Sequence, residues 1–394
     1  MTGFFRKFLR DNASRLQAAD TPQIFLAAFG KHAGWDDHLP DRGLGLDTET
    51  LLVAKALFYV EGIGGQISTG AWKALDSGMR NPFDHWLLWL RSDQFILGRM
   101  WDSVDGHGRT EYPMVVCAHC IGCTLPWALS TVMPKLEEIR NVCVATQAEN
   151  EVRTVLEHSR QNLRRQLSEL AEESIPSTFP QPNRELLLNC PALDSDREGL
   201  LRVLHKVQES MGAYAPGNRL VDPPTSTLPG PRSGRAPEPG LRPEFLRVPA
   251  CGHSAADSLL LWSDFLFHHV DRSAPVLFLL PNARKWLDIV VGKPTSPVFF
   301  CLRASLKVLP LESEITHEMT APFRASALQF LENYRSASDT TADASSRTLR
   351  PASILLVLLL LLASAAVYLR FASKQEIPAF LRYPAQLLGN PDIH

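Results

Sequence analysis

The sequence predicts a mixed α/β (α+β) protein with two folded units and a single C-terminal transmembrane helix. Three observations lead to this prediction: short apolar strand patterns alternate with amphipathic helix patterns, a Pro-rich stretch separates two such regions, and an uncharged apolar run begins at Pro351. As a helix rising 1.5 Å per residue, the run from Pro351 to Leu369 would extend about 28 Å, close to the thickness of a bilayer's hydrocarbon core. We therefore expect a transmembrane helix at residues 351–370, followed by a C-terminal tail at 371–394.

Residues 1–20 interleave Phe and Leu with Arg and Lys, which is typical of a short amphipathic segment. Packing on the first domain is the expected role, and a second membrane contact is the alternative. The first domain is expected at residues 21–147. It opens with the strand-like segment IFLAAF (24–29) and continues with helical spacing of apolar residues in TETLLVAKALFYVEG (48–62).

Three short apolar segments later in this domain predict further strands: FDHWLLWLR (83–91), QFILGRMWDS (94–103) and YPMVVCAH (112–119). The first two are joined by a short polar turn and predict a hairpin. The glycine-rich segment EGIGGQISTG (61–70) lacks the Lys-Ser/Thr ending of a phosphate-binding loop, so we expect a loop that uses positive backbone angles.

Residues 148–212 predict a helical region, with one amphipathic helix from Asn150 to about Ser174 and another near Asp196 to Met211. Residues 213–240 form a Pro-rich linker, whose PxxP-like spacing leaves binding by a recognition domain as an alternative.

A second, small α/β unit is expected at residues 241–334, and a flexible stalk rich in Ser, Thr, Ala and Asp at 335–350. Within the small unit the patterns predict, in order, a helix at 254–270, a strand at 275–281, a helix at 282–292 and a strand at 296–305.

The net charge of −2 and the pI near 6.6 argue against nucleic acid as a partner, because nucleic-acid binding usually requires a concentrated basic surface. Seven cysteines and the lack of a secretory signal at the N-terminus favour reduced thiols in the cytoplasm. The charges that flank the apolar run are nearly balanced. The missing secretory signal therefore decides the orientation, and the expected location is the inner (cytoplasmic) membrane, single-pass, with the N-terminal region in the cytoplasm.

The densest polar cluster is FGKHAGWDDHLPDRGLGLD, Phe29 to Asp47. It could serve a metal or general acid/base chemistry, although its spacing matches no established template. The preferred interpretation is a strand, a turn and capping Asp side chains. The alternative is a membrane-tethered hydrolase or metal-dependent enzyme. Its candidate residues are His32, Asp36, Asp37 and His38.

Two further motifs favour structural roles. CAHCIGC contains Cys117, Cys120 and Cys123, but a metal site needs a fourth ligand, and a buried strand is the simpler interpretation. In CGHSAADS (251–258), Ser254 and Asp257 are placed to cap the helix that follows. We therefore expect no catalytic residue, cofactor or bound metal.

Two short segments resemble the TagF (also ImpM) family associated with bacterial type VI secretion. These are Phe29-Gly30-Lys31 followed by Gly34, and Gly108-Arg109-Thr110-Glu111-Tyr112-Pro113-Met114. The family has a Phe-Gly-Lys turn after its first strand and a later Gly-Arg-x-Phe/Tyr-Pro stretch that enters a strand. Here Thr110-Glu111 inserts one extra residue before Tyr112, and the resemblance spans roughly residues 24–126. The family does not usually carry a C-terminal membrane span.

The resemblance implies a longin/profilin-like N-terminal domain that regulates through protein contact and carries no catalytic residues. Its implied partner is a protein at the membrane, either a forkhead-associated scaffold or another secretion component. A scaffold of an unrelated envelope system is a further alternative. The candidate contact residues are polar or aromatic residues on turns: Lys31, Trp35, Asp36, Asp37 and Arg109.

Overall fold

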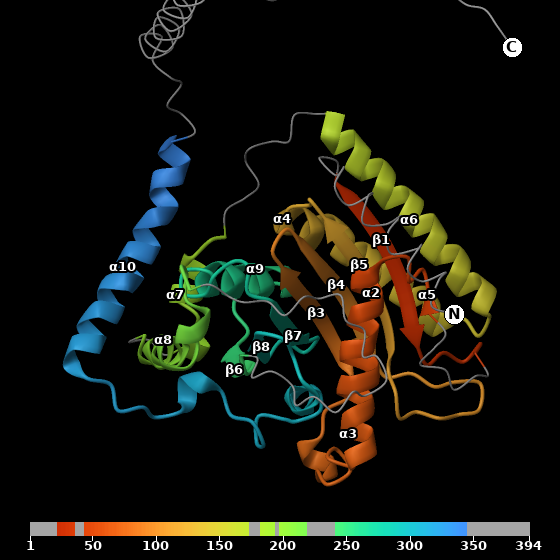
Figure 1. The fold of residues 1–394 in the computed structure, drawn as a ribbon, viewed down its shortest axis with the longest axis horizontal. Coiled ribbons are helices and arrows are strands. Elements are labelled where there is room, and N and C mark those ends of the chain that lie inside the picture. The colour runs from red at the N-terminus through yellow and green to blue at the C-terminus, as the bar shows by residue number, and fades with distance from the viewer. Residues whose placement is uncertain (1–21, 36–42, 173–181, 194–196, 219–240, 345–394) are drawn as a thin grey trace, which may run out of the picture. The chain divides into compact units, whose positions relative to one another are not determined.

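The structure of the chain, a computed structural model, describes residues 22–35, 43–172, 182–193, 197–218 and 241–344 (Figure 1). The amphipathic segment 1–20, most of the Pro-rich linker, the apolar run 351–370 and the tail 371–394 lie outside the described residues. Within the described residues, no helix combines the length and the apolar character needed to cross a bilayer.

One antiparallel sheet of eight strands organises the described residues, in the order β2-β1-β5-β4-β3-β7-β8-β6 (Figure 1). The strands are β1 (Gln23–Gly30), β2 (Gly43–Leu44), β3 (Asp84–Arg91), β4 (Gln94–Trp101), β5 (Met114–Ile121), β6 (Glu244–Pro249), β7 (Val276–Pro281) and β8 (Trp286–Val291). The structure confirms the mixed α/β class, the first strand, the β3–β4 hairpin and the strand at residues 275–281.

The two regions that the sequence separates contribute to the same sheet. β3, from the region 21–147, pairs with β7, from the region 241–334, in a register that runs from His85 opposite Pro281 to Leu90 opposite Val276. The described residues up to Arg335 accordingly form one compact unit. Strand pairing at this distance along the chain leaves no local pattern in the sequence. The expected boundary between two folded units therefore falls within a single sheet.

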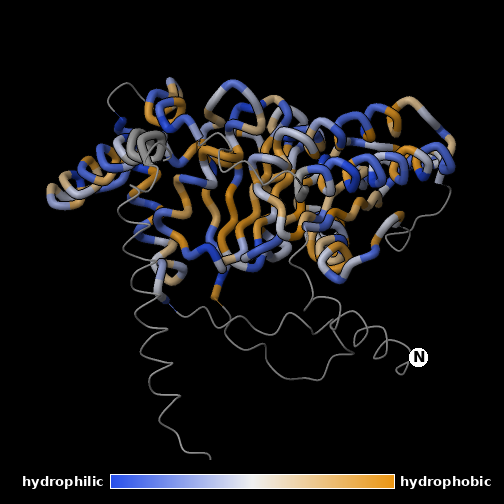
Figure 2. The backbone as a smooth tube through the Cα atoms, turned by 90° about the horizontal axis from the view of Figure 1, so that it is seen from above, coloured by the Kyte–Doolittle hydropathy of each residue, from blue (hydrophilic) through white to orange (hydrophobic). Residues whose placement is uncertain are grey.

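Helices cover both faces of the sheet. Successive strand residues point to opposite sides, and the central strands carry apolar residues on both, so each face needs a covering layer. Leu88 and Leu97 belong to one core, shared with α5 (Met133–Ala145), α6 (Glu149–Glu172), α8 (Glu198–Ser210) and α9 (Ala255–Leu266). Leu87 and Ile96 belong to the other core, beneath the helix at residues 49–69. Figure 2 shows apolar residues concentrated in the central strands and hydrophilic residues more frequent in the helices around them.

The predicted loop at residues 61–70 is wrong, because this segment is helical. A continuous helix runs through α2 (Glu49–Ala54), a wider π-helical stretch η1 (Lys55–Ile63) and α3 (Gly64–Thr69), and the positive backbone angle comes only at its end, at Gly70. The glycines serve close packing instead. A Cβ atom on Gly62 would lie 2.6 Å from the Phe299 ring, and one on Gly65 would lie 2.2 Å from the Ser296 hydroxyl.

Two predictions in the C-terminal region are also wrong. Residues 282–292 contain the strand β8 rather than a helix, and residues 296–305 contain the 3-10 helix η6 (Ser296–Leu302) rather than a strand. Asp288 gives β8 the appearance of an amphipathic helix, but this carboxylate is fully buried against Arg247 of the neighbouring strand β6. Pro297 lies in the first turn of η6, and the Phe299 ring of η6 packs against Gly62.

The long helices are close to their predicted positions. α6 and α8 confirm the two predicted amphipathic helices, and α9 confirms the helix after CGHSAADS. As predicted, Ser254 and Asp257 form a reciprocal capping box at the start of α9. α10 (Ala321–Ala344) extends into the region expected to be a flexible stalk, so the first half of that prediction is wrong.

We predict that Gly62→Ala destabilises the protein. The methyl group would enter the space of the buried Phe299 ring, and overpacking of this kind costs about 1–3 kcal/mol, more than the roughly 1 kcal/mol that alanine gains over glycine in a helix. Urea unfolding followed by tryptophan fluorescence measures the change. Gly78→Ala is the matched control, because a Cβ atom there meets nothing within 4 Å. Equal stability of the two variants would contradict the packing argument.

Candidate functional site

The two segments that carry the family resemblance lie side by side. Gly30 ends β1 with a positive φ of 112°, and the next residue, Lys31, donates its backbone N–H to the Pro113 carbonyl over 3.1 Å. A Cβ atom on Gly30 would lie 2.2 Å from that carbonyl oxygen, so only glycine fits this approach. The Phe-Gly-Lys turn is therefore joined directly to the Gly108–Met114 segment.

A buried carboxylate, Asp105, fastens the two segments together. It accepts a hydrogen bond from Lys31 Nζ at 2.5 Å and from Arg109 Nε at 2.7 Å. Its other oxygen accepts backbone N–H groups of His107 and Arg109. Lys31 is 6% exposed and Asp105 is more deeply buried still. We call Lys31, Asp105 and Arg109 the Asp105 corner.

The charges of the Asp105 corner compensate one another in a buried setting. Burial by itself raises the pKa of the Asp105 carboxyl, but hydrogen bonds from Lys31 and Arg109 hold this pKa well below its ordinary range. The carboxylate is therefore ionised at neutral pH and serves as an anchor for the loop.

The next turn, His32 to Trp35, is also tied inward. His32 Nδ1 accepts the Gly34 backbone N–H at 3.0 Å, and Nε2 lies 3.1 Å from the Cys143 carbonyl, to which it donates. Burial lowers the pKa of His32, so its ring is neutral at pH 7. Both ring nitrogens are engaged, which leaves no lone pair for a metal ion or a proton transfer in this conformation. Trp35 packs against the His32 ring.

The candidate contact residues therefore fall into three groups. Lys31 and Trp35 are 6% and 7% exposed, so the structure contradicts their assignment as surface contacts. The Lys31 ammonium pairs with Asp105, and the Trp35 ring packs in the core. Arg109 is partly exposed but pairs with Asp105. Asp36 and Asp37 lie outside the described residues, as does His38 of the alternative enzyme cluster.

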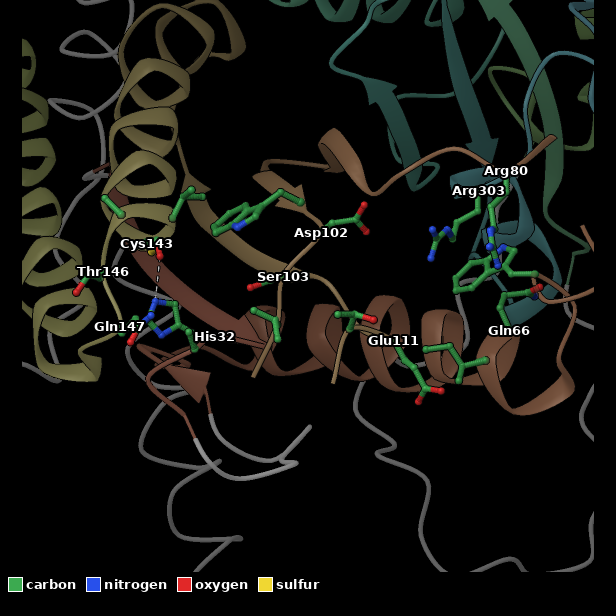
Figure 3. Close-up of a pocket in the computed structure, with 18 of the residues that line it drawn as sticks. His32, Gln66, Arg80, Asp102, Ser103, Glu111, Cys143, Thr146, Gln147 and Arg303 are labelled. Carbon is green, nitrogen blue, oxygen red and sulfur yellow. Dashed lines mark hydrogen bonds between the residues drawn. The ribbon is translucent and has the colours of Figure 1, made fainter. Parts of the chain in front are cut away.

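A pocket of about 770 Å³ opens beside the Asp105 corner (Figure 3). His32 and Ala33 line it directly after the Phe-Gly-Lys turn, and Thr110 and Glu111 line it from within the second motif segment. The pocket is within the usual size range of ligand and peptide sites. Its remaining walls come from the end of the helix at 49–69, the segment that follows it as far as Arg80, the end of β4 and the loop after it, the α5–α6 connection and Arg303.

Positive charge is concentrated at one end of the pocket. In Figure 3, Arg80, Arg303 and Gln66 lie opposite the end formed by His32, Thr146 and Gln147, with Asp102 and Glu111 between them. Arg303 stacks on the Phe83 ring and donates to the Asn81 carbonyl. Burial lowers the pKa of Arg303, Asp102 opposes this shift, and Arg80 lowers it further. Two neighbouring guanidinium groups favour an anionic ligand.

The CAHCIGC segment is structural in the described residues. Cys117 and Cys120 are buried on opposite faces of β5, because their odd spacing in a strand sends them to different sides. His119 engages both nitrogens, with Thr48 Oγ1 at 3.0 Å and Gln94 Oε1 at 2.7 Å. The Cys120 and Cys123 thiols interact with each other, but Cys117 and the imidazole do not join them at one point.

Sequence reasoning missed Asp105, Arg80 and Arg303. Asp105 belongs to the Asp-Gly-His-Gly turn that marks a loop, and its partner Lys31 lies far away in the sequence. Arg80 and Arg303 come together through an isolated bridge between the Arg80 and Ala304 backbones. Gly30, immediately before Lys31, was the available signal, since its close approach to the Pro113 carbonyl leaves no room for a side chain.

Comparisons with protein-family models, curated proteins and solved structures gave no match to this chain.

We predict that Asp105→Asn destabilises the protein by about 3 kcal/mol at pH 7, because it leaves Lys31 buried without a full counter-charge. The folded pKa of Asp105 is depressed, so its contribution is complete above its unfolded pKa of about 3.9 and declines as the pH falls below that value. Urea unfolding at pH 7 and pH 3.5 should show a smaller difference at the lower pH.

The exposed Asp76→Asn is the control and should change stability little at either pH. A difference between Asp105→Asn and the unsubstituted protein that does not change with pH would contradict the charge-based role.

Proposed function

We propose that this protein is a non-catalytic, membrane-anchored regulatory scaffold that acts through protein contacts in a type VI secretion-associated, TagF-like role. One observation carries the proposal. The two motif segments that resemble the family converge at the Asp105 corner, and the residues that follow Lys31 and Arg109 line one pocket. The segments that define the resemblance therefore also line part of this recess.

The chemistry of the pocket suits a protein segment as its ligand. Apolar surface from Ile67, Trp72 and Val144 lies in the same recess as Arg80 and Arg303. The Arg80 side chain is exposed and has no ion-pair partner among the described residues. An extended acidic segment of a partner would place a carboxylate at the arginine end and apolar side chains along the wall.

The enzyme alternative receives less support from the described residues. His32 is neutral and uses both nitrogens within the fold, so it is not poised as a base. The titratable groups in the pocket are spread along its length, as Figure 3 shows, and do not form a nucleophile–base pair.

We place the described unit on the cytoplasmic side of the inner membrane, with residues 351–370 as the anchor. The seven cysteines carry free thiols in the structure, as is usual in a reducing compartment. Anchoring raises the effective concentration of the pocket near a membrane-bound partner, such as a forkhead-associated scaffold or another secretion component, without adding contacts.

We predict that a photo-crosslinking amino acid at Val144 captures a partner protein in cells, because Val144 is 60% exposed on the pocket wall. The same amino acid at Leu328, 43% exposed on α10, is the control position. Arg80→Glu should reduce the Val144 crosslink about tenfold, the effect of losing one charge-assisted hydrogen bond.

Arg272→Glu makes the same charge change at an exposed residue just before β7 that does not line the pocket, so it should leave the crosslink intact. Mass spectrometry identifies the captured protein. Crosslinking of equal strength from Val144 and Leu328, or an Arg80→Glu variant that crosslinks as well as Arg272→Glu, would refute the pocket as the contact surface.

We further predict that the full chain stays in the membrane pellet after carbonate extraction. Leu358→Arg with Leu361→Arg should release it to the supernatant, because each arginine costs about 3 kcal/mol at the centre of a transmembrane helix. Leu387→Arg with Leu388→Arg, in the tail, adds the same charge and should leave the protein in the pellet. Extraction of the unsubstituted chain by carbonate would exclude residues 351–370 as an anchor.

A further inference from the structure

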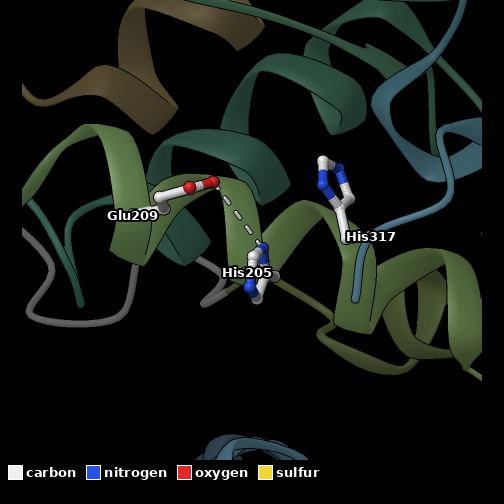
Figure 4. A group of neighbouring side chains, drawn as sticks. All are labelled: His205, Glu209 and His317. Carbon is white, nitrogen blue, oxygen red and sulfur yellow. Dashed lines mark ion pairs between the residues drawn. The ribbon is translucent and has the colours of Figure 1, made fainter. Parts of the chain in front are cut away.

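A second group of ligand-type side chains lies on α8, apart from the pocket. His205 and Glu209 are four residues apart and so share one face of the helix. His317 approaches that face from the segment between η7 (Glu312–Glu314) and α10 (Figure 4). One ligand atom from each of the three residues lies within 4.8 Å of the others.

His317 is held in the orientation of a metal ligand. Its Nε2 atom lies 2.7 Å from Glu312 Oε1, and this carboxylate is buried. A proton on Nε2 that is donated to a carboxylate leaves the lone pair of Nδ1 free. Histidines that bind metals usually have this arrangement, because the carboxylate fixes the tautomer and makes the other nitrogen more basic.

His205 supplies an unsatisfied nitrogen. Its Nδ1 atom is inaccessible to solvent, makes no hydrogen bond and lies 3.8 Å from Glu209 Oε2. The His205 and His317 rings stack with centroids 5.1 Å apart, and the edge of Phe323 closes the far side. A surface His–Glu pair alone needs no ion. A bound metal ion better explains a buried nitrogen that has no hydrogen-bond partner and lies beside a second oriented imidazole.

Two interactions hold the two sides of this cluster together. Arg202, on the same face of α8, donates to the Ser313 carbonyl at 2.8 Å. Glu198, one turn earlier, accepts two hydrogen bonds of 2.8 Å from Arg324 near the start of α10. His317 lies between these two attachments in the sequence, so its backbone is held near α8 before any ion binds. A preorganised site of this kind lowers the ordering cost of binding.

We propose that His205, Glu209 and His317 bind a divalent transition-metal ion, with Zn²⁺ as the expected ion and Glu312 as the residue that positions His317. Two imidazoles and one carboxylate match the preference of Zn²⁺ and disfavour Mg²⁺ and Ca²⁺, which take oxygen ligands. Three protein ligands leave a fourth position for water. The bound ion would join α8 to the segment that leads into α10.

The test is calorimetric titration of the full chain with Zn²⁺ in detergent, after treatment with a chelator. The unsubstituted protein should bind one Zn²⁺ at this site, and His205→Gln with His317→Gln should lose that binding. Glu312→Gln should weaken it about 10- to 100-fold, as expected for a residue that orients a ligand. His158→Gln removes an exposed histidine on α6 and is the matched control.

Cobalt substitution separates this site from the cysteines. Co²⁺ bound to the unsubstituted chain should show visible d–d bands without the thiolate charge-transfer band that cysteine ligands produce, and this readout needs no variant to fold. Zinc stoichiometry that is unchanged in the double variant, or a thiolate band in the cobalt spectrum, would overturn the proposal. The result is independent of partner capture at the pocket, because the two sites share no residue.

Discussion

The pairing of β3 with β7 is the constraint on which the rest of the structure depends. It joins Leu90 to Val276 and His85 to Pro281, and so makes one sheet from two distant parts of the chain. All six residues of β7 are buried, so this strand could not remain an open edge in water without exposing apolar surface and unpaired backbone groups. The same pairing brings η6 onto Gly62 and places Arg303 beside Arg80 at the pocket. Neither half of the chain contains a complete pocket by itself.

Local patterns were enough for elements whose neighbours are close in sequence. The β3–β4 hairpin, α6 and the capping box of α9 all follow from periodicity or a short motif. The prediction for β8 was wrong because one buried charge, Asp288, interrupts the apolar run of this strand. Only the position of Arg247 on a strand formed about forty residues earlier explains how that carboxylate is accommodated. The predicted loop at the glycines of residues 62–65 was wrong for a similar reason. These glycines pack against η6, which lies far along the chain.

The candidate site shows the same division. The sequence singled out the Phe-Gly-Lys segment and the Gly-Arg segment, and the structure places them in contact. No sequence pattern indicated that Lys31 would be neutralised by a carboxylate 74 positions away. The prediction therefore assigned a buried side chain to the surface. Long polar side chains on turns are usually exposed, and only the tertiary arrangement shows which of them are consumed by an internal ion pair. The pocket residues Arg80 and Arg303 gave no motif because they are united by a single backbone bridge.

The β3–β7 register also has a consequence for synthesis on the ribosome. β3 is complete at Arg91, whereas β7 begins at Val276, about 185 residues later. At a translation rate of roughly 5–20 residues per second, β3 waits on the order of 10–40 s for its partner strand to be made. During that interval the chain holds an apolar strand edge that no later part of itself can yet cover. An unpaired apolar edge is a template for association with other molecules, so the exposure of β3 to such pairing lasts until β7 has been made.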